Sequence, residues 1–248
     1  MFRPLAPLTL AAVLAAAPLS AFDLTAMTDE ERSAFRDEIR EYLIENPEVI
    51  VEAMRVLEDR RALAQTQNDR ETIAANFDAI VNDGFSWVGG NPDGDVTLVE
   101  FMDYRCGFCR RAHPEVAKLL QADGNIRWVV KEFPILGEDS VVASRFAVAT
   151  KQIMGDDAYK QAHDALIEMS GAVSDVTLRR LSDGLGFDTD EILDHMDSED
   201  VTREIQATRE LAQRLKISGT PTFILQDEML RGFLPADEMA EIVAEKRG

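Results

Sequence analysis

The chain has 248 residues, of which 46% are apolar, and 26 Lys and Arg residues stand against 46 Asp and Glu residues. This length and composition suffice for one generous folded domain or for a domain with an appendage. The formal net charge of −20 argues against binding to nucleic acids or to anionic membranes, because both roles need basic patches.

The first 21 residues have the pattern of an export signal. Arg3 supplies a positive start, and Leu5 to Ala17 form a short apolar run. The small residue Ala21 precedes the expected cleavage site. A membrane anchor is the weaker alternative, since a spanning helix needs about 20 apolar residues, and no later apolar stretch is long enough to span. We therefore predict export to the periplasm, where a disulfide can persist.

Residues 22–84 are predicted to form a separate helical region. The run from Thr28 to Glu31 has the form of a capping box that opens a first helix, and Pro47 suits the first turn of a second. Apolar residues follow sparse helical spacings, at Phe35, Ile39, Tyr42, Leu43, Ile50, Met54, Leu57, Ala64, Ile73, Phe77 and Ile80. Such a narrow stripe either docks on the main domain or associates with copies of itself. Of the two, we favour self-association through residues 22–82, which would make a homo-oligomer.

The main domain, residues 85–248, is predicted to begin just before the turn cluster at Gly89 to Gly94. Val96 to Met102 and Ile126 to Phe133 have the composition of buried strands, and a helical pattern lies between them. A strand, a helix and a strand in this order indicate parallel pairing within an α/β fold.

The pattern from about residue 138 to residue 216 is helical throughout. Strand character returns only at Thr222 to Leu225 and at Met229 to Gly232, and Pro235 to Lys246 has the pattern of a last amphipathic helix. A sheet interrupted by so long a helical stretch implies a helical insertion into an α/β domain.

The only two cysteines, Cys106 and Cys109, open the helical pattern that follows the first strand. Cysteines three residues apart at a helix N-terminus lie on one face, and the helix dipole there favours the thiolate. A structural disulfide would constrain so small a loop little, and a structural zinc site normally needs four ligands. We interpret the pair as a redox-active dithiol without a further cofactor. Cys106, at the exposed helix start, is the expected nucleophile, and the more buried Cys109 resolves mixed disulfides.

Glu100 interrupts an otherwise apolar strand face, and a buried carboxylate is costly unless it has a partner or a function. Lys131 on the neighbouring strand is the expected partner. We interpret Glu100 as a proton acceptor for Cys109. The alternative is that Glu100 lies at an exposed strand end.

Other polar residues surround the dithiol. Arg105, Arg110 and Arg111 are expected to lower the pKa of the nucleophile, or else to lie on a solvated face. His113, four residues past Cys109, is most simply a surface histidine, although it could tune the dithiol or help to hold Cu(I). The remaining histidines carry no functional signal.

The dipeptide Thr220-Pro221 precedes the returning strand, and X-Pro bonds are where cis peptides occur. The chain resembles the thioredoxin fold in four features: this dipeptide, the strand–CxxC–helix unit, Pro114 and the helical insertion. The segments VTLVEFMDYRCGFC and GTPTF are similar to the active-site strand and the cis-proline loop of the DsbA-like exported thiol oxidoreductases. The similarity covers about residues 89–248. The acidic helical leader before it looks like that of the ScsC-type members, suppressors of copper sensitivity.

The resemblance implies a thioredoxin-like α/β fold with an inserted helical domain and an N-terminal helical extension. It also implies that Cys106 attacks disulfides in exported proteins, that Cys109 resolves them, and that Glu100 is the family's buried acid. Thr220 and cis-Pro221 would lie against the dithiol and bind substrate backbone.

The same resemblance bears on the direction of the reaction. Threonine before the cis-proline is typical of isomerases, and the leader helices of ScsC-type proteins assemble oligomers. Gly107-Phe108 differs from the Pro-His pair of the strong oxidase DsbA. We therefore predict a disulfide isomerase or reductase that a membrane partner keeps reduced, with no dedicated metal site. A DsbA-like oxidase and a copper-binding chaperone that uses both cysteines are the alternatives.

Overall fold

The structure, a computed structural model, describes residues 26–248, so the expected export signal and its cleavage site lie outside the described residues. Contacts divide the chain into two compact units, residues 1–59 and 60–248. Helix α2, Glu48–Ala75, begins in the first unit and ends in the second. Within residues 26–248, no helix is both long and apolar enough to cross a membrane.

The described part of the first unit, residues 26–59, is almost entirely helical. Helix α1, Asp29–Glu45, begins with the expected capping box: Thr28 Oγ1 accepts the Glu31 N–H at 3.2 Å, and the Thr28 N–H donates to Glu31 Oε2 at 2.9 Å. Helix α1 has no buried residue. The large apolar side chains exposed in this unit are Phe35, Ile39, Tyr42, Ile44, Ile50, Val51, Met54, Val56 and Leu57. The unit therefore presents an apolar surface on charged helices.

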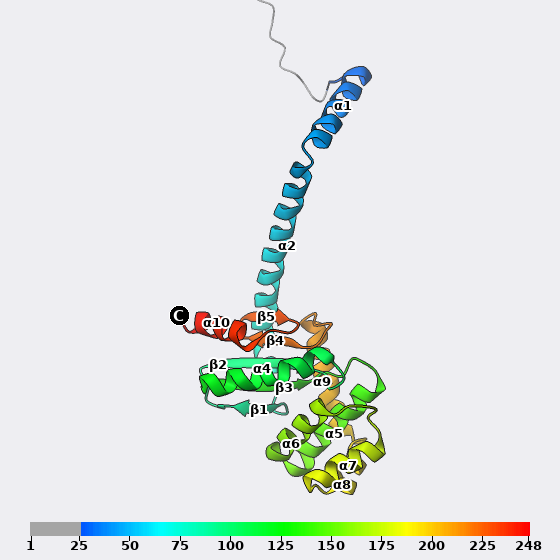
Figure 1. Ribbon diagram of the computed structural model, residues 1–248, viewed down its shortest axis with the longest axis vertical. Helices are drawn as coiled ribbons and strands as arrows, with labels where there is room; N and C mark the ends of the chain where they lie inside the picture. The colour runs from blue at the N-terminus through cyan, green and yellow to red at the C-terminus, as the bar shows by residue number, and fades with distance from the viewer. Residues whose placement is uncertain (1–25) are drawn as a thin grey trace, which may run out of the picture. The chain divides into compact units, whose positions relative to one another are not determined.

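The second unit is built on a five-stranded sheet with the strand order β1-β3-β2-β4-β5 (Figure 1). The strands are β1 Trp87–Gly90, β2 Val96–Met102, β3 Ile126–Glu132, β4 Thr222–Leu225 and β5 Glu228–Arg231. Strands β2 and β3 pair in parallel, as expected, and the other pairs are antiparallel. Strand β1 departs from the expectation, because the turn begins only at Asn91 and the two preceding glycines pair with β3.

Helices complete the second unit. They are α3 Phe77–Val81, α4 Gly107–Asp123, α5 Glu138–Met154, α6 Asp156–Glu168, α7 Asp175–Leu185, α8 Thr189–His195, α9 Glu199–Arg214 and α10 Ala236–Arg247. Helices α4 and α10 contribute buried residues to one face of the sheet, whereas α3 and the end of α9 contribute to the other. Helices α5 to α9 lie between β3 and β4 in the chain, which is the expected helical insertion.

Alternation along β2 and β3 decides which side chains can meet, because successive residues of a strand face opposite sides of the sheet. Leu98 and Met102 belong to the core on the α4 face, and Val99 and Phe101 to the core on the α3 face. Glu100 therefore faces α4. Lys131 is in register with Phe101 and faces α3. The expected Glu100–Lys131 pair is wrong, because the two side chains lie on opposite faces.

The end of α2 and the segment after it pack on the α3 face of the sheet. Ile73 and Ile80 are buried there, and Asp69 accepts two hydrogen bonds from Arg231 of β5, at 2.7 and 2.9 Å. The sequence predicts a domain boundary at residue 85, whereas contacts extend the second unit back to Arg60. The second unit begins earlier than predicted because residues before the turn cluster bury apolar side chains on the sheet and form an ion pair with it.

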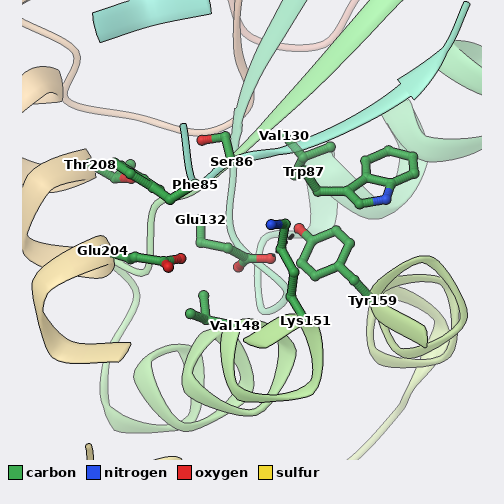
Figure 2. Close-up of a pocket in the computed structure, with 10 residues that line it drawn as sticks. All are labelled: Phe85, Ser86, Trp87, Val130, Glu132, Val148, Lys151, Tyr159, Glu204 and Thr208. Carbon is green, nitrogen blue, oxygen red and sulfur yellow. Dashed lines mark hydrogen bonds between the residues drawn. The ribbon is translucent and has the colours of Figure 1, made fainter. Parts of the chain in front are cut away.

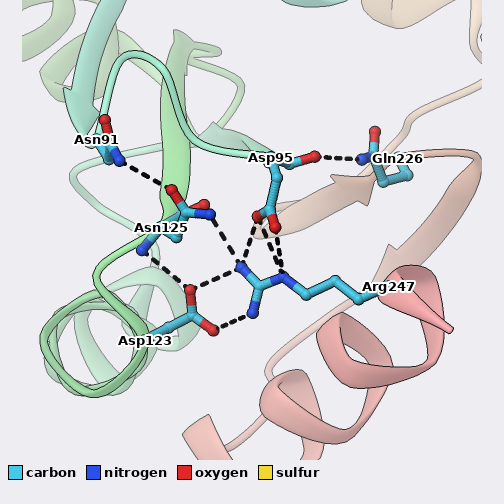
Figure 3. A network of polar contacts seen from close by, with 6 residues as sticks. All are labelled: Asn91, Asp95, Asp123, Asn125, Gln226 and Arg247. Atoms are coloured by element: carbon cyan, nitrogen blue, oxygen red, sulfur yellow. Dashed lines mark hydrogen bonds and ion pairs between the residues drawn. The ribbon is translucent and has the colours of Figure 1, made fainter.

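A single arginine ties the C-terminal helix to the helix that carries the cysteines. Arg247 of α10 binds the carboxylates of Asp95, which precedes β2, and of Asp123, at the end of α4, over distances of 2.5 to 3.1 Å (Figure 3). Asn91 and Asn125 form a further hydrogen bond beside it, at 2.9 Å. This network fixes the far end of α4 against β2.

Candidate active site

The two cysteines lie at the N-terminus of α4, directly after β2. Cys106 is the N-cap residue and Cys109 lies in the first turn, and both are free thiols. Cys106 is 6% exposed and Cys109 is 1% exposed. The expectation of an exposed Cys106 is therefore wrong, because the loop at Thr220 approaches it: the Cys106 thiol donates to the Thr220 carbonyl at 3.1 Å. Cys109 is the more buried of the two, as expected.

A buried carboxylate that the sequence analysis missed shapes the approach to α4. Asp103 accepts the backbone N–H of Arg105 at 2.8 Å, and those of Ile135 and Leu136 at 2.8 and 3.1 Å. One side chain thus fixes both the turn before the cysteines and the loop that follows β3. Its signal in the sequence is weak, since an aspartate after a strand is equally typical of an exposed turn.

The loop before β4 completes the surroundings of Cys106. The Thr220–Pro221 peptide bond is cis, as the resemblance implied. Strand β4 pairs with β2 so that Thr222 lies opposite Phe101, which brings the loop beside the end of β2. The Thr220 hydroxyl is buried and makes no hydrogen bond within residues 26–248, yet it lies near enough to lower the pKa of Cys106. A thiolate at Cys106 would provide the acceptor that this hydroxyl lacks.

The pKa values of the two thiols diverge. The pKa of Cys106 falls to about 5, chiefly because the Cys109 thiol donates to its sulfur; Thr220 and the backbone N–H groups of Cys109 and Phe108 add to the effect, and burial opposes it. The same contact, together with burial, raises the pKa of Cys109 well above its usual range. At neutral pH the pair is therefore one thiolate and one thiol.

The three arginines near the cysteines are engaged elsewhere. Arg105 donates to the Gly171 carbonyl at 2.6 Å, Arg110 donates to the Tyr104 carbonyl at 3.2 Å, and Arg111 stacks over the Phe108 ring at 4.4 Å. The low pKa of the nucleophile follows mainly from hydrogen bonds at the helix start. The expectation that these arginines lower it further is not supported, because hydrogen bonds are the main causes of the lowering and burial opposes it.

Glu100 lies on the α4 face of β2 and is 3% exposed, so the alternative of an exposed strand end is wrong. Burial raises the pKa of its carboxyl to about 8, the nearby Glu132 carboxylate adds to the rise, and the Trp128 indole partly offsets it. The Glu100 charge in turn raises the pKa of Cys109. Glu100 is thus within electrostatic reach of Cys109 and exchanges a proton close to neutral pH.

A buried polar network that the sequence analysis missed lies beside Glu100. Glu132 accepts hydrogen bonds from the hydroxyls of Tyr104 at 2.7 Å, Tyr159 at 2.6 Å and Ser144 at 2.7 Å. Figure 2 shows its carboxylate pointing into a small cavity, toward Tyr159. Burial raises the pKa of Glu132 to about 7. Strand alternation was the available signal, because Glu132 shares the parity of the core residues of β3.

Two histidines meet between α4 and α6. The rings of His113 and His163 are 5.4 Å apart, and His113 Nε2 lies 3.3 Å from an Asp164 oxygen. His163 is 1% exposed and contacts the Tyr104 hydroxyl through Nδ1 at 3.1 Å. His113 is therefore partly buried and paired with a carboxylate rather than a free surface residue, and His163 belongs to the core.

The family whose description is "DSBA-like thioredoxin domain" matches residues 97–244, more than half of the chain. The chain belongs to the DSBA-like thioredoxin family. Residues 31–64, which precede this DSBA-like domain, match the N-terminal domain of the copper resistance protein ScsC.

Solved structures agree with this family. A thioredoxin-like oxidoreductase from Silicibacter pomeroyi DSS-3 is 40% identical, with a TM-score of 0.65, over 68% of this chain and 96% of that chain. The thiol-disulfide exchange protein α-DsbA2 from Wolbachia pipientis is 26% identical, with a TM-score of 0.68, over 73% and 97%. ScsC from Proteus mirabilis, in a transitional conformation, is 25% identical, with a TM-score of 0.65, over 88% and 98%.

Curated relatives match a shorter part of the chain. The Na⁺/H⁺ antiporter NhaA 1 of Salinispora arenicola is 29% identical over 146 residues, which are 58% of this chain and 22% of that protein. Disulfide bond formation protein D of Bacillus subtilis is 25% identical over 166 residues, 62% of this chain and 73% of that protein. The DSBA-like chain thus spans about a fifth of the length of the first of these relatives.

Proposed function

We propose that this DSBA-like chain is a periplasmic thiol–disulfide oxidoreductase that isomerises or reduces disulfides in exported proteins. The observation that carries the proposal is the pair of divergent thiols: Cys106 has a pKa of about 5, while the pKa of Cys109 is raised. Only a thiolate attacks a disulfide, and the second cysteine must stay protonated while the first one attacks the substrate. The divergence supplies both conditions.

The reaction begins when the Cys106 thiolate attacks one sulfur of a substrate disulfide. A mixed disulfide forms, and the other substrate sulfur leaves as a thiolate. In isomerisation, a different substrate thiolate then attacks the mixed disulfide, and Cys106 is released unchanged. In reduction, Cys109 attacks Cys106 instead, the reduced substrate leaves, and the Cys106–Cys109 disulfide must be reduced again by a membrane partner.

Glu100 serves the second of these routes. Cys109 must lose its proton before it can attack, and its burial, which raises its pKa, opposes that loss. The Glu100 carboxyl, with a pKa of about 8, is partly ionised near neutral pH, and its carboxylate form accepts the proton where water has little access. When the disulfide is reduced again, the same carboxyl returns the proton to Cys109.

The surroundings of the dithiol fit a polypeptide substrate. Phe108, Ile135 and Leu136 are exposed apolar side chains on the two segments next to Cys106. The hydrogen bonds of Asp103 hold the Ile135–Leu136 loop beside the start of α4. Apolar side chains presented in this way favour the unfolded or misfolded segments in which wrong disulfides occur.

The first unit supports isomerisation rather than simple oxidation. Its exposed apolar side chains on α1 and the first part of α2 are available for self-association, and residues 31–64 match the ScsC N-terminal domain. An oligomer would place several dithiols around one substrate. This is the arrangement that repeated attack on wrong disulfides needs.

A dithiol oxidase is the second candidate, and one observation favours it. A nucleophile with a pKa of about 5 stabilises the reduced form of the pair, which makes the corresponding disulfide more oxidising. In this case the Cys106–Cys109 disulfide would be donated to substrates.

Reactivation of a scrambled disulfide substrate distinguishes the candidates. The full chain without its export signal, reduced beforehand, is expected to restore the substrate's activity, and Cys106→Ala is expected to restore none. If the wild-type protein oxidises a reduced substrate but fails to reactivate a scrambled one, the oxidase is correct. Copper binding by the cysteines without either reaction would instead support the copper-binding chaperone.

The contribution of the first unit to reactivation is tested by placing a charged side chain on its apolar surface. Met54→Glu places a carboxylate among the exposed apolar side chains of α2, whereas Val176→Glu does the same at an exposed position of α7. We expect Met54→Glu to reduce both the oligomer mass in sedimentation and the reactivation rate, with dithiol oxidation of small thiols unchanged. Equal effects of the two variants would contradict a role for residues 22–82.

A further inference from the structure

We propose that His113, His163 and Asp164 form a binding site for a divalent transition-metal ion such as Zn²⁺, between α4 and α6. The site lies outside the dithiol, and it goes beyond the proposed thiol–disulfide exchange. Two imidazoles and a carboxylate are a donor set that Zn²⁺ takes readily, with a fourth position open to water.

The three side chains are already close to the spacing that a metal ion needs. One ligand atom from each lies within 4.8 Å of the others, and His113 Nε2 is 3.3 Å from Asp164 Oδ1. Ligand atoms around a tetrahedral zinc ion lie about 3.3 Å apart, since each is about 2.0–2.2 Å from the metal. The cluster therefore needs a contraction of about 1.5 Å or less, which side-chain rotation can supply.

His163 is the ligand that the surrounding structure prepares. The Tyr104 hydroxyl donates its proton to Glu132 at 2.7 Å, so its oxygen is free to accept a hydrogen bond from His163 Nδ1–H at 3.1 Å. This chain of hydrogen bonds places the proton of the imidazole on Nδ1 and the lone pair on Nε2. A hydrogen bond to the far nitrogen is the usual way in which proteins orient a metal-binding histidine.

The Nε2 atom of His163 then has no partner. It is buried and makes no hydrogen bond within residues 26–248, while Asp164 Oδ1 has only His113 Nε2 beside it, at 3.3 Å. A buried polar atom without a partner is costly, and such atoms are few in folded proteins. A satisfied core histidine would not show this pattern. An unpartnered imidazole nitrogen next to a histidine–carboxylate pair is explained by a cation that all three side chains can bind.

Entry also fits. The Asp164 side chain is 40% exposed, which opens the cluster to solvent, whereas His163 forms its closed end. Lys160 binds the other oxygen of Asp164 at 2.5 Å and opposes a cation, but this lysine is itself exposed and can swing away.

A metal ion in this site would join two parts of the second unit. His113 belongs to the helix that carries Cys109, and His163 and Asp164 belong to the helical insertion. The ion would therefore fix α4 against α6, and its binding should raise the melting temperature of the protein.

Calorimetric titration with Zn²⁺ tests the site. The protein is the full chain without its export signal, with Cys106→Ser and Cys109→Ser so that the thiols take no metal. We expect one ion per chain. His113→Ala and Asp164→Asn should each weaken the affinity by about tenfold or more, because loss of a ligand costs at least as much as loss of its supporting contact. Lys160→Gln should strengthen it, since a competing cation is removed.

His195→Ala is the matched control, because it removes the third histidine of the chain from a position outside the cluster. Binding that is absent, that survives His113→Ala, or that falls equally in His195→Ala would overturn the proposal. Circular dichroism and thermal unfolding of each variant exclude loss of the fold as the cause. The wild-type chain with both thiols alkylated provides a second preparation, should the double serine variant fold poorly.

Discussion

Both faces of the sheet of the second unit bury ionisable side chains, and Lys131 and Glu100 on opposite faces have different surroundings. On the α3 face, Lys131 binds Asp83 at 2.5 Å and the Ala79 carbonyl at 3.1 Å. On the α4 face, burial raises the pKa of the Glu100 carboxyl, and only the Trp128 indole opposes this rise. Burial alone therefore does not mark a functional group. Burial without a counter-charge, beside a reactive pair, does.

The largest effect is expected from breaking the satisfied pair. Asp83→Asn leaves the Lys131 ammonium buried without a counter-charge, which should cost about 3–5 kcal/mol in the free energy of unfolding. Urea denaturation measures it. Asp227→Asn, which removes an exposed partner of Lys246 and Arg70, should cost no more than about 1 kcal/mol. Similar losses in both variants would mean that Lys131 is not held by its pair.

Substitution of Glu100 should stabilise the protein, in contrast to substitution of Asp83. Its folded pKa of about 8 is raised above the ordinary 4.5, so the unfolded chain ionises first and stability falls as pH rises from about 4.5 to 8. Glu100→Gln removes this loss. The variant should exceed the wild type by on the order of 3 kcal/mol at pH 8, and by little at pH 4.5. Parallel pH profiles of the two proteins would show that Glu100 is not the source of the slope.

The same substitution should slow the chemistry. Without a proton acceptor for Cys109, release of a reduced substrate from the mixed disulfide should slow about 100-fold, while the attack of Cys106 keeps its rate. Stopped-flow measurement of the two steps separates them. Lys131→Met, on the other face of the sheet, should leave both rates of the folded protein unchanged, and a slowing there would remove the distinction between the faces.

A smaller effect is expected at the loop that covers the nucleophile. Thr220→Val removes the hydroxyl near the Cys106 sulfur, so the pKa of Cys106 should rise by about one unit or less, equivalent to about 1.4 kcal/mol. The pH dependence of alkylation by iodoacetamide reports this shift. Arg111→Gln should leave the midpoint in place, because Arg111 stacks on Phe108. If the pKa of Cys106 shifted more in Arg111→Gln than in Thr220→Val, the arginine charge would be the main cause of the low pKa.

Much of the second unit follows from local patterns. The apolar runs and turns around Val96–Met102 and Ile126–Phe133 predict the two central strands to within one residue at their ends. The dithiol at the start of α4 follows from two cysteines that open a helical pattern. Such features depend on residues that are neighbours in the chain, so they can be predicted from the sequence alone.

What the sequence analysis missed depends on how strands and helices pair. Whether Lys131 can reach Glu100 is decided by the register of β2 and β3, which places them on opposite faces. His163 follows Tyr159 by four residues and precedes Ile167 by four, so helical spacing did place it on a buried face. Its contact with His113 could not be predicted, because the sequence of neither helix alone shows that α6 packs against α4.

The most direct test is the ultraviolet absorbance of the thiolate in the reduced full chain, followed from about pH 3 to pH 10. We expect one thiolate per chain, which titrates near pH 5 and disappears in Cys106→Ser. A midpoint near 9, the ordinary value for a cysteine, or a low midpoint that survives in Cys106→Ser, would contradict the assignment of Cys106 as the nucleophile.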